Sequence, residues 1–449
     1  MRRNRTTSAA ALRAAWARRR CIRFTRGLDF GRVRLSPMIR ILRFPPGAYR
    51  EVGREGAAGS PGPAAFTLAR RVPGPEEWPD MNTPLTVVDV SGTPEEMGTA
   101  YGRAAADLIN LNVTAYLDRF SRGAGLDLAA VTAQGAAFRE TTLSHFPRLA
   151  AMLDGVARGA SVAPELIYAI NARSELLYGA PACGSPGASA GDRGECTSLG
   201  VLGPRSEGGR TLLAQNWDWH PGHRDYNVLL ITRDERGHEV ITLTEAGMLA
   251  KTGLNSAGVG VCVNLLGCDR DGRPGGVPYH VLLRSVLEAD SLSWAIRNAM
   301  RAPRSASINL LLGQAYPGGG ELIDLELAPG DAGWLHPVDG VLVHANHFEA
   351  ALPVYDTIKD WGGSSLFRSA RARRLLTAVP NPLTPADLRA VLQDHHSHPV
   401  AICRHADDRD ADDDRSETIW TVFMDLDDRF IRLVPGPPCT GGEGTTYSL

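Results

Sequence analysis

Gly194-Glu195-Cys196-Thr197-Ser198-Leu199-Gly200-Val201 and, one hairpin's length later, Gln215-Asn216-Trp217-Asp218-Trp219 are the two stretches that decide the fold. A loop of small and polar residues with Gly and Pro, residues 179–192, precedes the first stretch and cannot build a core. A cysteine that begins a strand behind such a flexible loop can become an N-terminal residue if the chain is cut before it. Its freed α-amine, with an unperturbed pKa of about 7.7 to 8.0, could then serve as the base for the neighbouring thiol. The pattern therefore favours Cys196 as a nucleophile.

The composition is that of an ordinary globular protein: 449 residues, 43% hydrophobic and 22% charged. No apolar run approaches the roughly 20 residues of a membrane span, and no apolar segment of a signal peptide begins the chain. These features favour a cytoplasmic protein without a membrane partner. Seven cysteines without a CxxC pair fit neither a disulfide framework nor a zinc module. Apart from Cys196 they are expected to be free thiols: Cys21, Cys183, Cys262, Cys268, Cys403 and Cys439.

Residues 1–80 differ from the rest of the chain in charge. They hold 17 Arg and six acidic residues, a net charge of +11, which leaves −13 for residues 81–449. A basic arm of this kind could contact nucleic acid or anionic lipid. However, the segment has no sustained helical or strand period, and lysine occurs only at positions 251 and 359, which suggests an Arg-biased genome. We interpret residues 1–80 as a disordered or mis-annotated leader and expect no nucleic-acid partner.

The segment before Cys196 is mainly helical by its pattern. Residues 85–90 predict a strand, and Thr93-Pro94-Glu95-Glu96 predicts a capping box that starts a helix. The apolar stripe of that helix runs on to Val113. Further helices are predicted through 149–157 and from Pro164, the latter carrying residues 171–175, for which a solvated charged face is the alternative.

After Cys196 the hydrophobic period changes to that of strands. The predicted strands are 211–215, 228–232, 240–244, 259–264, 307–312, 321–327, 418–424 and 429–434. The predicted helices are 278–288, 292–299, 365–376 and one capped by Thr384. Blocks of strands interrupted by paired helices predict an α+β fold of antiparallel sheets covered by helices. The Pro- and Gly-rich tail, residues 435–449, is expected to be mobile.

A set of short motifs in fixed order resembles one known family. The motifs are Cys196-Thr197-Ser198, Asn216-Trp217-Asp218, and the segments 244–247, 253–259, 276–278, 343–347 and 399–404. Together they resemble the acyl-CoA:6-aminopenicillanic acid (isopenicillin N) acyltransferase family, peptidase family C45, over roughly residues 85–435. The fungal acyltransferase has Gly before its nucleophile, where this chain has Glu195; bacterial relatives often carry Glu there.

The resemblance implies a fold and an activity. The fold would be the four-layer αββα sandwich of the N-terminal-nucleophile (Ntn) hydrolases, formed by residues 81–449. The chain would cut itself between Glu195 and Cys196, and the segments 81–195 and 196–449 would stay associated. It would act on an amide bond or acyl-thioester of a small N-acyl substrate or peptide, with acyl-CoA as one candidate, through an acyl-Cys196 intermediate. No cofactor is implied.

Four further residues are predicted to take part in catalysis. Asp218 would hold the freed amine from the neighbouring strand. Asn346 is the first choice for the side-chain donor to the oxyanion, and Asn264 is the second, by similarity to the bile-salt hydrolase and penicillin V acylase branch of the fold. Arg415 matches the position of an active-site arginine of the family, and Arg404 is the weaker candidate.

Three alternatives stay open. A papain-like Cys–His enzyme would use His344 or His347 as base and need no cleavage. A catalytically silent member of the fold would only bind a small molecule. A metal site is suggested by His395, His396 and His398 together with the other two histidines, but without HExxH or a cysteine partner spacing loop histidines are the preferred interpretation, and no metal is expected.

Overall fold

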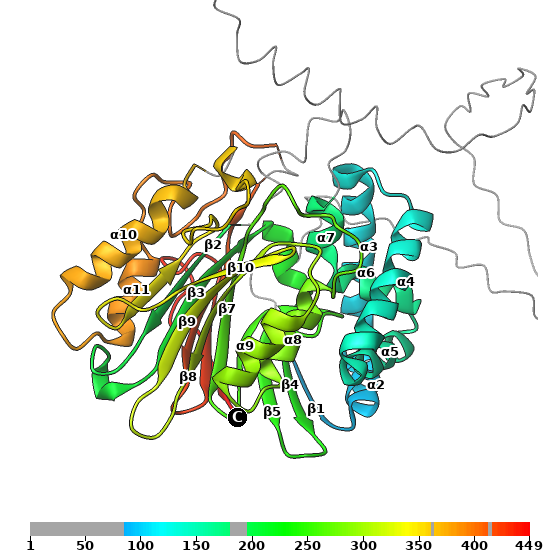
Figure 1. Ribbon diagram of the computed structural model, residues 1–449, viewed down its shortest axis with the longest axis horizontal. Helices are drawn as coiled ribbons and strands as arrows, with labels where there is room; N and C mark the ends of the chain where they lie inside the picture. Colours follow the sequence, from blue (N-terminus) through cyan, green and yellow to red (C-terminus); the bar gives the residue numbers. More distant parts are fainter. Residues whose placement is uncertain (1–84, 180–194, 361–362, 412–414) are drawn as a thin grey trace, which may run out of the picture. The chain divides into compact units, whose positions relative to one another are not determined.

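Two β-sheets lie face to face in the computed structural model, which describes residues 85–179, 195–360, 363–411 and 415–449 (Figure 1). Within these ranges the first sheet has eight strands, in the spatial order β1-β4-β5-β6-β7-β8-β9-β10, and the second has six, β11-β2-β3-β12-β13-β14. The strands of the first sheet are β1 (Thr86–Gly92), β4 (Asn227–Asp234), β5 (Glu239–Glu245), β6 (Thr252–Asn255), β7 (Val259–Leu265), β8 (Ile308–Gln314), β9 (Glu321–Ala328) and β10 (Asp331–Leu335). Those of the second are β2 (Cys196–Val201), β3 (Leu212–Trp219), β11 (Val341–His344), β12 (Glu417–Asp425), β13 (Phe430–Pro435) and β14 (Thr445–Ser448).

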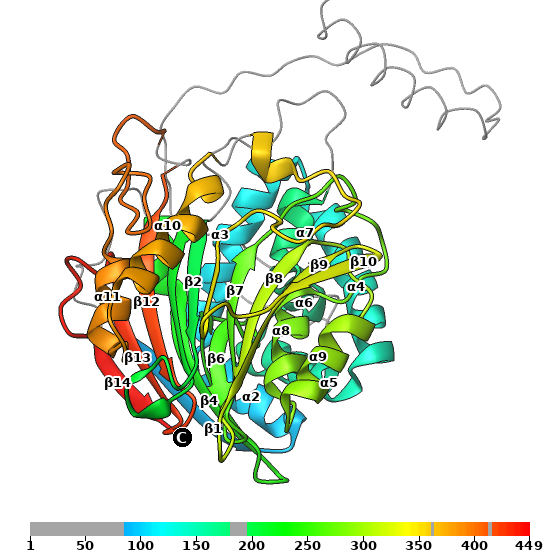
Figure 2. The ribbon, with the colours of Figure 1, turned by 60° about the vertical axis from the view of Figure 1, so that its left-hand side comes forward.

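Helices cover the outer face of each sheet (Figures 1 and 2). The first sheet is covered by α2 (Pro94–Ala104), α3 (Ala106–Ala124), α4 (Leu128–His145), α5 (Pro147–Ala160), α6 (Pro164–Asn171), α7 (Arg173–Tyr178), α8 (Tyr279–Leu287) and α9 (Leu292–Arg301). The second is covered by α10 (Ser365–Ala378) and α11 (Pro385–Leu392). Short 3₁₀ turns occur at Glu207–Gly209, Pro221–Tyr226 and Thr357–Asp360.

Three hydrophobic cores separate the four layers. Neighbouring residues of a strand point to opposite faces of its sheet. Accordingly Leu229 of β4 packs in the core between the sheets, with Leu213 of β3. The next residue, Leu230, belongs to the core under α2–α9. Leu199 of β2 and Leu376 of α10 share the third core. The predicted four-layer αββα sandwich of the α+β class is thus confirmed.

Local sequence signals explain several boundaries. The two predicted helix starts are real: the Glu96 carboxylate accepts the N–H of Thr93 at 2.9 Å, and Asp387 does the same for Thr384 at 2.8 Å. Both helices also carry Pro in the first turn, where its missing N–H costs no hydrogen bond.

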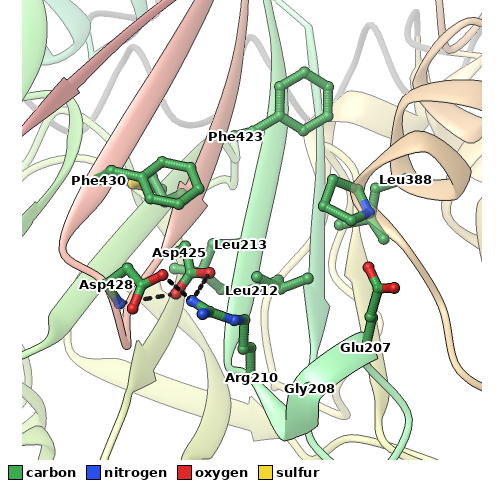
Figure 3. Close-up of a pocket in the computed structure, with 12 residues that line it drawn as sticks. Glu207, Gly208, Arg210, Leu212, Leu213, Leu388, Phe423, Asp425, Asp428 and Phe430 are labelled. Atoms are coloured by element: carbon green, nitrogen blue, oxygen red, sulfur yellow. Dashed lines mark hydrogen bonds and ion pairs between the residues drawn. The ribbon is translucent and has the colours of Figure 1, made fainter.

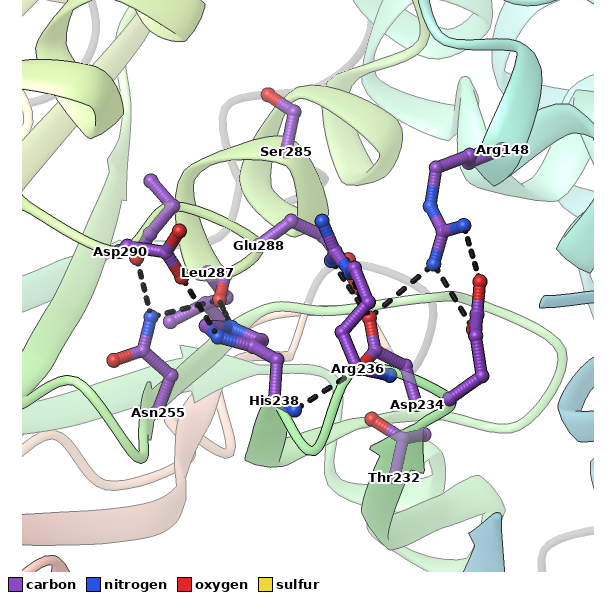
Figure 4. Close-up of polar contacts among 12 residues, drawn as sticks. Arg148, Thr232, Asp234, Arg236, His238, Asn255, Ser285, Leu287, Glu288 and Asp290 are labelled. Carbon is purple, nitrogen blue, oxygen red and sulfur yellow. Dashed lines mark hydrogen bonds and ion pairs between the residues drawn. The ribbon is translucent and has the colours of Figure 1, made fainter. Parts of the chain in front are cut away.

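Polar side chains fix the β4–β5 hairpin to the helices above it (Figure 4). The Asp234 carboxylate accepts the backbone N–H of Arg236 and of His238, both at 2.9 Å, which closes the turn. It also forms an ion pair of 3.2 Å with Arg148 of α5. On the other side the His238 ring lies 2.8 Å from the carbonyl oxygen of Leu287 at the end of α8. The hairpin therefore holds two helices that are distant in sequence.

Several elements differ from the sequence prediction, among them the unpredicted strands β6, β10 and β11 and the parallel pairing of β1 with β4. The helix predicted from residue 94 to Val113 breaks at Ala105, whose φ of −113° and ψ of 21° are not helical, giving α2 and α3. Helix α4 was not predicted, because its apolar side chains are spread around its axis and form no stripe. The tail expected to be mobile instead contains β14, which pairs with β13 through the register Phe430↔Ser448.

Some predictions fall on residues that the structure does not describe. They are the leader, residues 1–80, all but the first residue of the loop 179–192, and the free thiols of Cys21 and Cys183. In the described part of the chain, the search for a helix long and apolar enough to cross a membrane finds none.

Candidate functional site

Cys196 is the first residue of β2 and lies at the edge where β2 meets β3. Its register partner is Trp217, so Asp218 is the next residue on the adjacent strand. The Cys196 side chain is buried, with 3% of its surface exposed. The two stretches are thus paired as predicted, which puts Cys196 and Asp218 on adjacent strands. The Cys196 side chain shares the face of Trp217, whereas the Asp218 carboxylate lies on the opposite face of the sheet, with Thr418.

The peptide bond between Glu195 and Cys196 is held on both sides. The carbonyl oxygen of Glu195 accepts the backbone N–H of Asp218 at 3.0 Å. The N–H of Cys196 donates to Oδ1 of Asn346 at 2.8 Å. A hydrogen bond to the carbonyl oxygen polarises the carbon that a nucleophile would attack. Oδ1 of Asn346 is also in position to accept a hydrogen bond from the amine that cleavage would create on Cys196.

The carbonyl oxygen of Cys196 has two side-chain donors. Arg368 donates from Nη1 at 2.6 Å and Asn264 from Nδ2 at 3.1 Å. Oδ1 of Asn264 in turn accepts the hydroxyl of Ser198 at 2.5 Å, which fixes the orientation of its amide. These contacts hold the start of β2 rigidly against β7 and α10.

Asn346 is oriented with its side-chain oxygen toward the nitrogen of Cys196, and its donor role toward a substrate oxyanion stays a prediction. Its Oδ1 also accepts Nη2 of Arg368 at 2.8 Å, while its Nδ2 donates to the carbonyl oxygen of Leu265 at 3.0 Å. A guanidinium can only donate and a backbone carbonyl can only accept, so these neighbours fix which atom of the amide is oxygen. The amide hydrogens of Asn346 point away from the nitrogen of Cys196.

The side chain of Glu195 occupies a buried cationic pocket. Its Oε2 lies 3.0 Å from Arg368, 2.8 Å from Arg404 and 2.5 Å from the hydroxyl of Ser364. Burial alone would raise the pKa of Glu195, but Arg404 and Arg368 lower it below its ordinary value. Glu195 is therefore an ionised carboxylate, anchored next to the peptide bond that it shares with Cys196.

Asp218 combines burial with incomplete hydrogen bonding. Its Oδ1 accepts the hydroxyl of Thr418 at 2.6 Å, whereas its Oδ2 is buried without a hydrogen-bond partner among the described residues. Burial raises its pKa to about 7, although Arg368 and the Thr418 hydroxyl act in the opposite direction. A carboxyl group with such a pKa can give up and take back a proton near neutral pH.

A small cavity lies beside the sulfur. It is lined by Arg173, Ser174, Cys196, Trp217, Asp218, Trp219, Lys251, Leu265 and Tyr279. The Lys251 ammonium lies 4.3 Å from the centre of the Trp217 ring. Burial lowers the pKa of Lys251 to about 8, and burial raises the pKa of Cys196, an effect that the charge of Lys251 opposes. The only buried lysine of the described residues thus faces the candidate nucleophile.

Residues 171–175 are buried, so the solvated-face alternative is wrong. Arg173 is 3% exposed; it pairs with Glu245 at 3.2 Å and lies over the Trp219 ring at 4.2 Å. Glu175 accepts the N–H of Tyr279 at 2.7 Å, and burial raises its pKa to about 8. This segment therefore forms one wall of the cavity.

The remaining predicted residues have other partners. Arg415, just before β12, forms an ion pair of 3.8 Å with Asp408, and its catalytic role stays a prediction. His344 lies 2.7 Å from Glu326 and 2.9 Å from the carbonyl oxygen of Ala345. Burial would lower the pKa of His344, but Asp324 and Glu326 raise it to about 9, so it is a cation near neutral pH and unsuited to be a base.

Sequence reasoning missed two residues of the site. Nothing in the predicted helix 365–376 marked Arg368, although it contacts both Glu195 and Cys196. Lys251 had one signal: it is one of only two lysines in the chain and follows an apolar run.

A second, larger cavity lies at the other end of β3 (Figure 3). It is lined mainly by β3, β12 and α11, with Phe423 and Phe430 on one side and Leu388 on another. At about 3.3 Å per residue, Leu212 and Asp218 are separated by roughly 20 Å along the strand. This cavity is therefore separate from the site at Cys196.

Comparison with known proteins identifies a family, and the similar proteins include the following two. Residues 205–438 match the family described as AAT, acyl-coenzyme A:6-aminopenicillanic acid acyl-transferase. The chain is 26% identical, over 349 residues, to the acyl-coenzyme A:6-aminopenicillanic-acid-acyltransferase 40 kDa form of Emericella nidulans, covering 75% of this chain and 89% of the relative. Penicillin V acylase from Agrobacterium tumefaciens is a solved structure that is similar at a TM-score of 0.35 and 15% identity, over 54% of this chain and 83% of that one. A TM-score this low supports no conclusion about activity.

Proposed function

Because the chain belongs to the acyl-coenzyme A:6-aminopenicillanic acid acyl-transferase family, we propose that it is a cysteine-nucleophile enzyme that cuts itself before Cys196 and then transfers or hydrolyses acyl groups. One observation carries the proposal: the peptide bond between Glu195 and Cys196 is held at its oxygen by a donor and at its nitrogen by an acceptor. The donor would stabilise the charge that develops on the attacked oxygen, and the acceptor would bind the amine after its release.

The self-cleavage would begin with attack of the Cys196 sulfur on the carbonyl carbon of Glu195. A C–S bond forms, and the negative charge gathers on the oxygen to which the Asp218 N–H already donates. The C–N bond then breaks, and the thiol proton passes to the nitrogen of Cys196, leaving a thioester. One water molecule hydrolyses that thioester, so Glu195 ends in a carboxylate and Cys196 has a free thiol and a free amine.

Asp218 is the candidate proton carrier for this step. A pKa of about 7 would let it take the thiol proton through an intervening water molecule and pass it to the amine. After cleavage the new amine would find two acceptors, Oδ1 of Asn346 and the unpartnered Oδ2 of Asp218. In the mature enzyme that amine would be the base for the thiol.

The acyl donor and acceptor are proposed from the relatives. The curated relative is named for an acyl-coenzyme A donor and 6-aminopenicillanic acid as acceptor. For this chain we propose small acyl-CoA thioesters or N-acyl amines as donors, with an amine or water as acceptor. The acyl group would rest on Cys196, whose neighbours Lys251 and Trp217 line the cavity.

Mass spectrometry of the purified protein tests the proposal. We expect a fragment of 254 residues, Cys196–Leu449, that begins Cys-Thr-Ser, and a bound acyl group on its N-terminal peptide after brief exposure to a panel of acyl-CoA thioesters and N-acyl amines. Cys196→Ala should stay uncut and inactive, and Cys196→Ser should cut slowly because a hydroxyl is the poorer nucleophile.

Two results would favour the alternatives. Full activity of an uncut wild-type chain would favour a Cys–His enzyme, although the cationic His344 is a poor base for it. An uncut chain whose Cys196 fails to react with any donor, yet which binds one of them, would favour a silent binding protein.

A further inference from the structure

Two cysteines and two histidines from separate segments converge on one point near the surface. They are His395 and His405, from the loop that follows α11, with Cys403 of that loop and Cys439 from the segment between β13 and β14. Their ligand atoms all lie within 4.8 Å of one another. Cys403 and Cys439 are 36 residues apart in the sequence, which is why no motif revealed the group.

Four of the six distances between the ligand atoms of this group match a tetrahedral metal site. The two sulfurs are 3.6 Å apart; Nε2 of His405 lies 3.6 Å from the sulfur of Cys403 and 3.4 Å from that of Cys439. The two histidine Nε2 atoms are 3.2 Å apart. Zn–S bonds of about 2.3 Å and Zn–N bonds of about 2.0–2.1 Å in a tetrahedron place two sulfurs about 3.8 Å apart, S and N about 3.5 Å, and two nitrogens about 3.3 Å.

From this match we infer that the protein holds a structural zinc ion on Cys403, Cys439, His395 and His405. Two thiolates and two imidazoles are a donor set that suits zinc, and four protein ligands make a closed site with no position for substrate. Binding releases the two thiol protons, and the two thiolate charges then neutralise the charge of Zn²⁺. A disulfide is the competing state, but the sulfurs at 3.6 Å are not bonded in the structure.

The surrounding contacts hold the ligands in place. The backbone N–H of Cys403 donates to the carbonyl oxygen of Asp394 at 3.0 Å. The Asp394 carboxylate accepts two hydrogen bonds from the guanidinium of Arg371 on α10, at 2.6 and 2.7 Å. Next to Cys439, the carbonyl oxygen of Pro438 accepts Nε2 of Gln393 at 2.8 Å. Both ligand-bearing segments are therefore fixed to the helices that cover the second sheet.

The ion would also position Arg404, which lies between two of its ligands in the sequence. Arg404 pairs with Glu195, and its N–H donates to the hydroxyl of Thr418 at 3.2 Å. That hydroxyl donates to Asp218. A zinc ion on Cys403 and His405 would thus hold the loop that completes the Glu195 pocket and the Asp218 environment.

Metal analysis of the full chain tests the inference. Protein purified untagged, with its thiols reduced and without chelator, should contain about one zinc per chain by elemental mass spectrometry. Replacement by Co²⁺ should give thiolate-to-cobalt charge transfer and the strong visible bands of a tetrahedral site. Cys439→Ser should lose the zinc and His395→Ala should bind it at least tenfold more weakly, whereas the matched variants Cys268→Ser and His396→Ala should keep it.

Several outcomes would overturn the inference. One is wild-type protein with reduced thiols that takes up neither Zn²⁺ nor Co²⁺. Another is a cobalt spectrum without a sulfur band. A third is native protein that is metal-free and two mass units lighter through a bond between Cys403 and Cys439. The cobalt spectrum is read on the wild-type chain, so a variant that fails to fold leaves the test intact.

Discussion

Nη1 of Arg404 lies 2.8 Å from Oε2 of Glu195, so the residue just before the nucleophile is held by an ion pair rather than exposed in the loop that precedes it. Arg368 forms the second ion pair to the same oxygen at 3.0 Å. Arg368 lies on α10 and Arg404 on the loop that follows α11, both on the C-terminal side of Cys196. The part of the chain after the proposed cut thus positions the residue before it.

Replacing Glu195 by Gln should slow self-cleavage by at least tenfold. Gln keeps the shape of the side chain but loses both ion pairs and leaves two buried guanidinium groups without their anion, a change that typically costs about 3–5 kcal/mol. The fraction of cut chain would be followed by gel and intact mass after cell-free synthesis. Glu207→Gln, at an exposed position, is the control and should cut at the wild-type rate. Equal rates for Glu195→Gln and wild type would show that the pocket does not assist cleavage.

Asp218 should give the self-cleavage a pH dependence. Its raised pKa of about 7 means that the carboxyl group is protonated below that pH and ionised above it, so a base role predicts a rate that rises through about pH 7 and then levels off. In Asp218→Asn the rate should fall by about 10²–10⁴ and lose this rise. Single-turnover cleavage measured from pH 5.5 to 8.5 decides the matter. Asp225→Asn, a half-buried aspartate outside the site, is the matched control.

The layering of the fold could be predicted because the hydrophobic periods change at Cys196 from helical to strand-like. The alternation of Leu229 and Leu230 between two cores shows why: strands buried on both faces leave a recognisable apolar run. The tail could not be predicted, since β14 gains its stability from pairing with β13 and its own composition resembles that of a loop.

The candidate site was predictable only where local sequence carries it. Cys196 and Asp218 lie on paired strands, and strand pairing can be inferred from the sequence. Arg368 and the acceptor orientation of Asn346 depend on how α10 packs on the second sheet, a tertiary arrangement without a local signal. The same holds for Cys439, whose partners lie in another segment.

Asn346 should act on cleavage through its oxygen. If Oδ1 must accept from the nitrogen of Cys196, Asn346→Asp retains an acceptor and should cut at more than about a tenth of the wild-type rate, whereas Asn346→Leu should be slower by about 10². If the amide hydrogens are what matters, as first predicted, both variants should fail alike. In the mature enzyme a donor role would lower kcat by about 10²–10³ with little change in KM. Measuring self-cleavage and turnover separately therefore shows whether the oxygen of the Asn346 side chain acts in cleavage and whether its amide nitrogen acts in turnover.

Removing the leader should leave the enzyme unchanged. A chain that starts at Met81 is expected to match the full chain in Tm and in turnover, because the family resemblance begins after that residue. An insoluble product, or a Tm lower by several degrees, would show that residues 1–80 contribute to the fold.

Lys251 should lower the pKa of the nucleophile in the mature enzyme. Burial disfavours the thiolate of Cys196, and the ammonium of Lys251 is the charge that most opposes this effect. Lys251→Met keeps the length and the contact with Trp217 but removes the charge, so the pKa of Cys196 should rise.

Because the pKa of Lys251 itself is lowered to about 8, its stabilisation of the Cys196 thiolate should be present at pH 7 and fade as the pH rises past 8. The rate of alkylation by iodoacetamide at pH 7 should therefore fall about three- to tenfold in Lys251→Met, while the two proteins should converge above pH 9. Lys359→Met removes the other lysine of the chain, whose side chain is 54% exposed, and should alkylate like wild type. A fall of the same size at pH 7 and at pH 9 would instead mean that Lys251 shapes access to the sulfur rather than its charge.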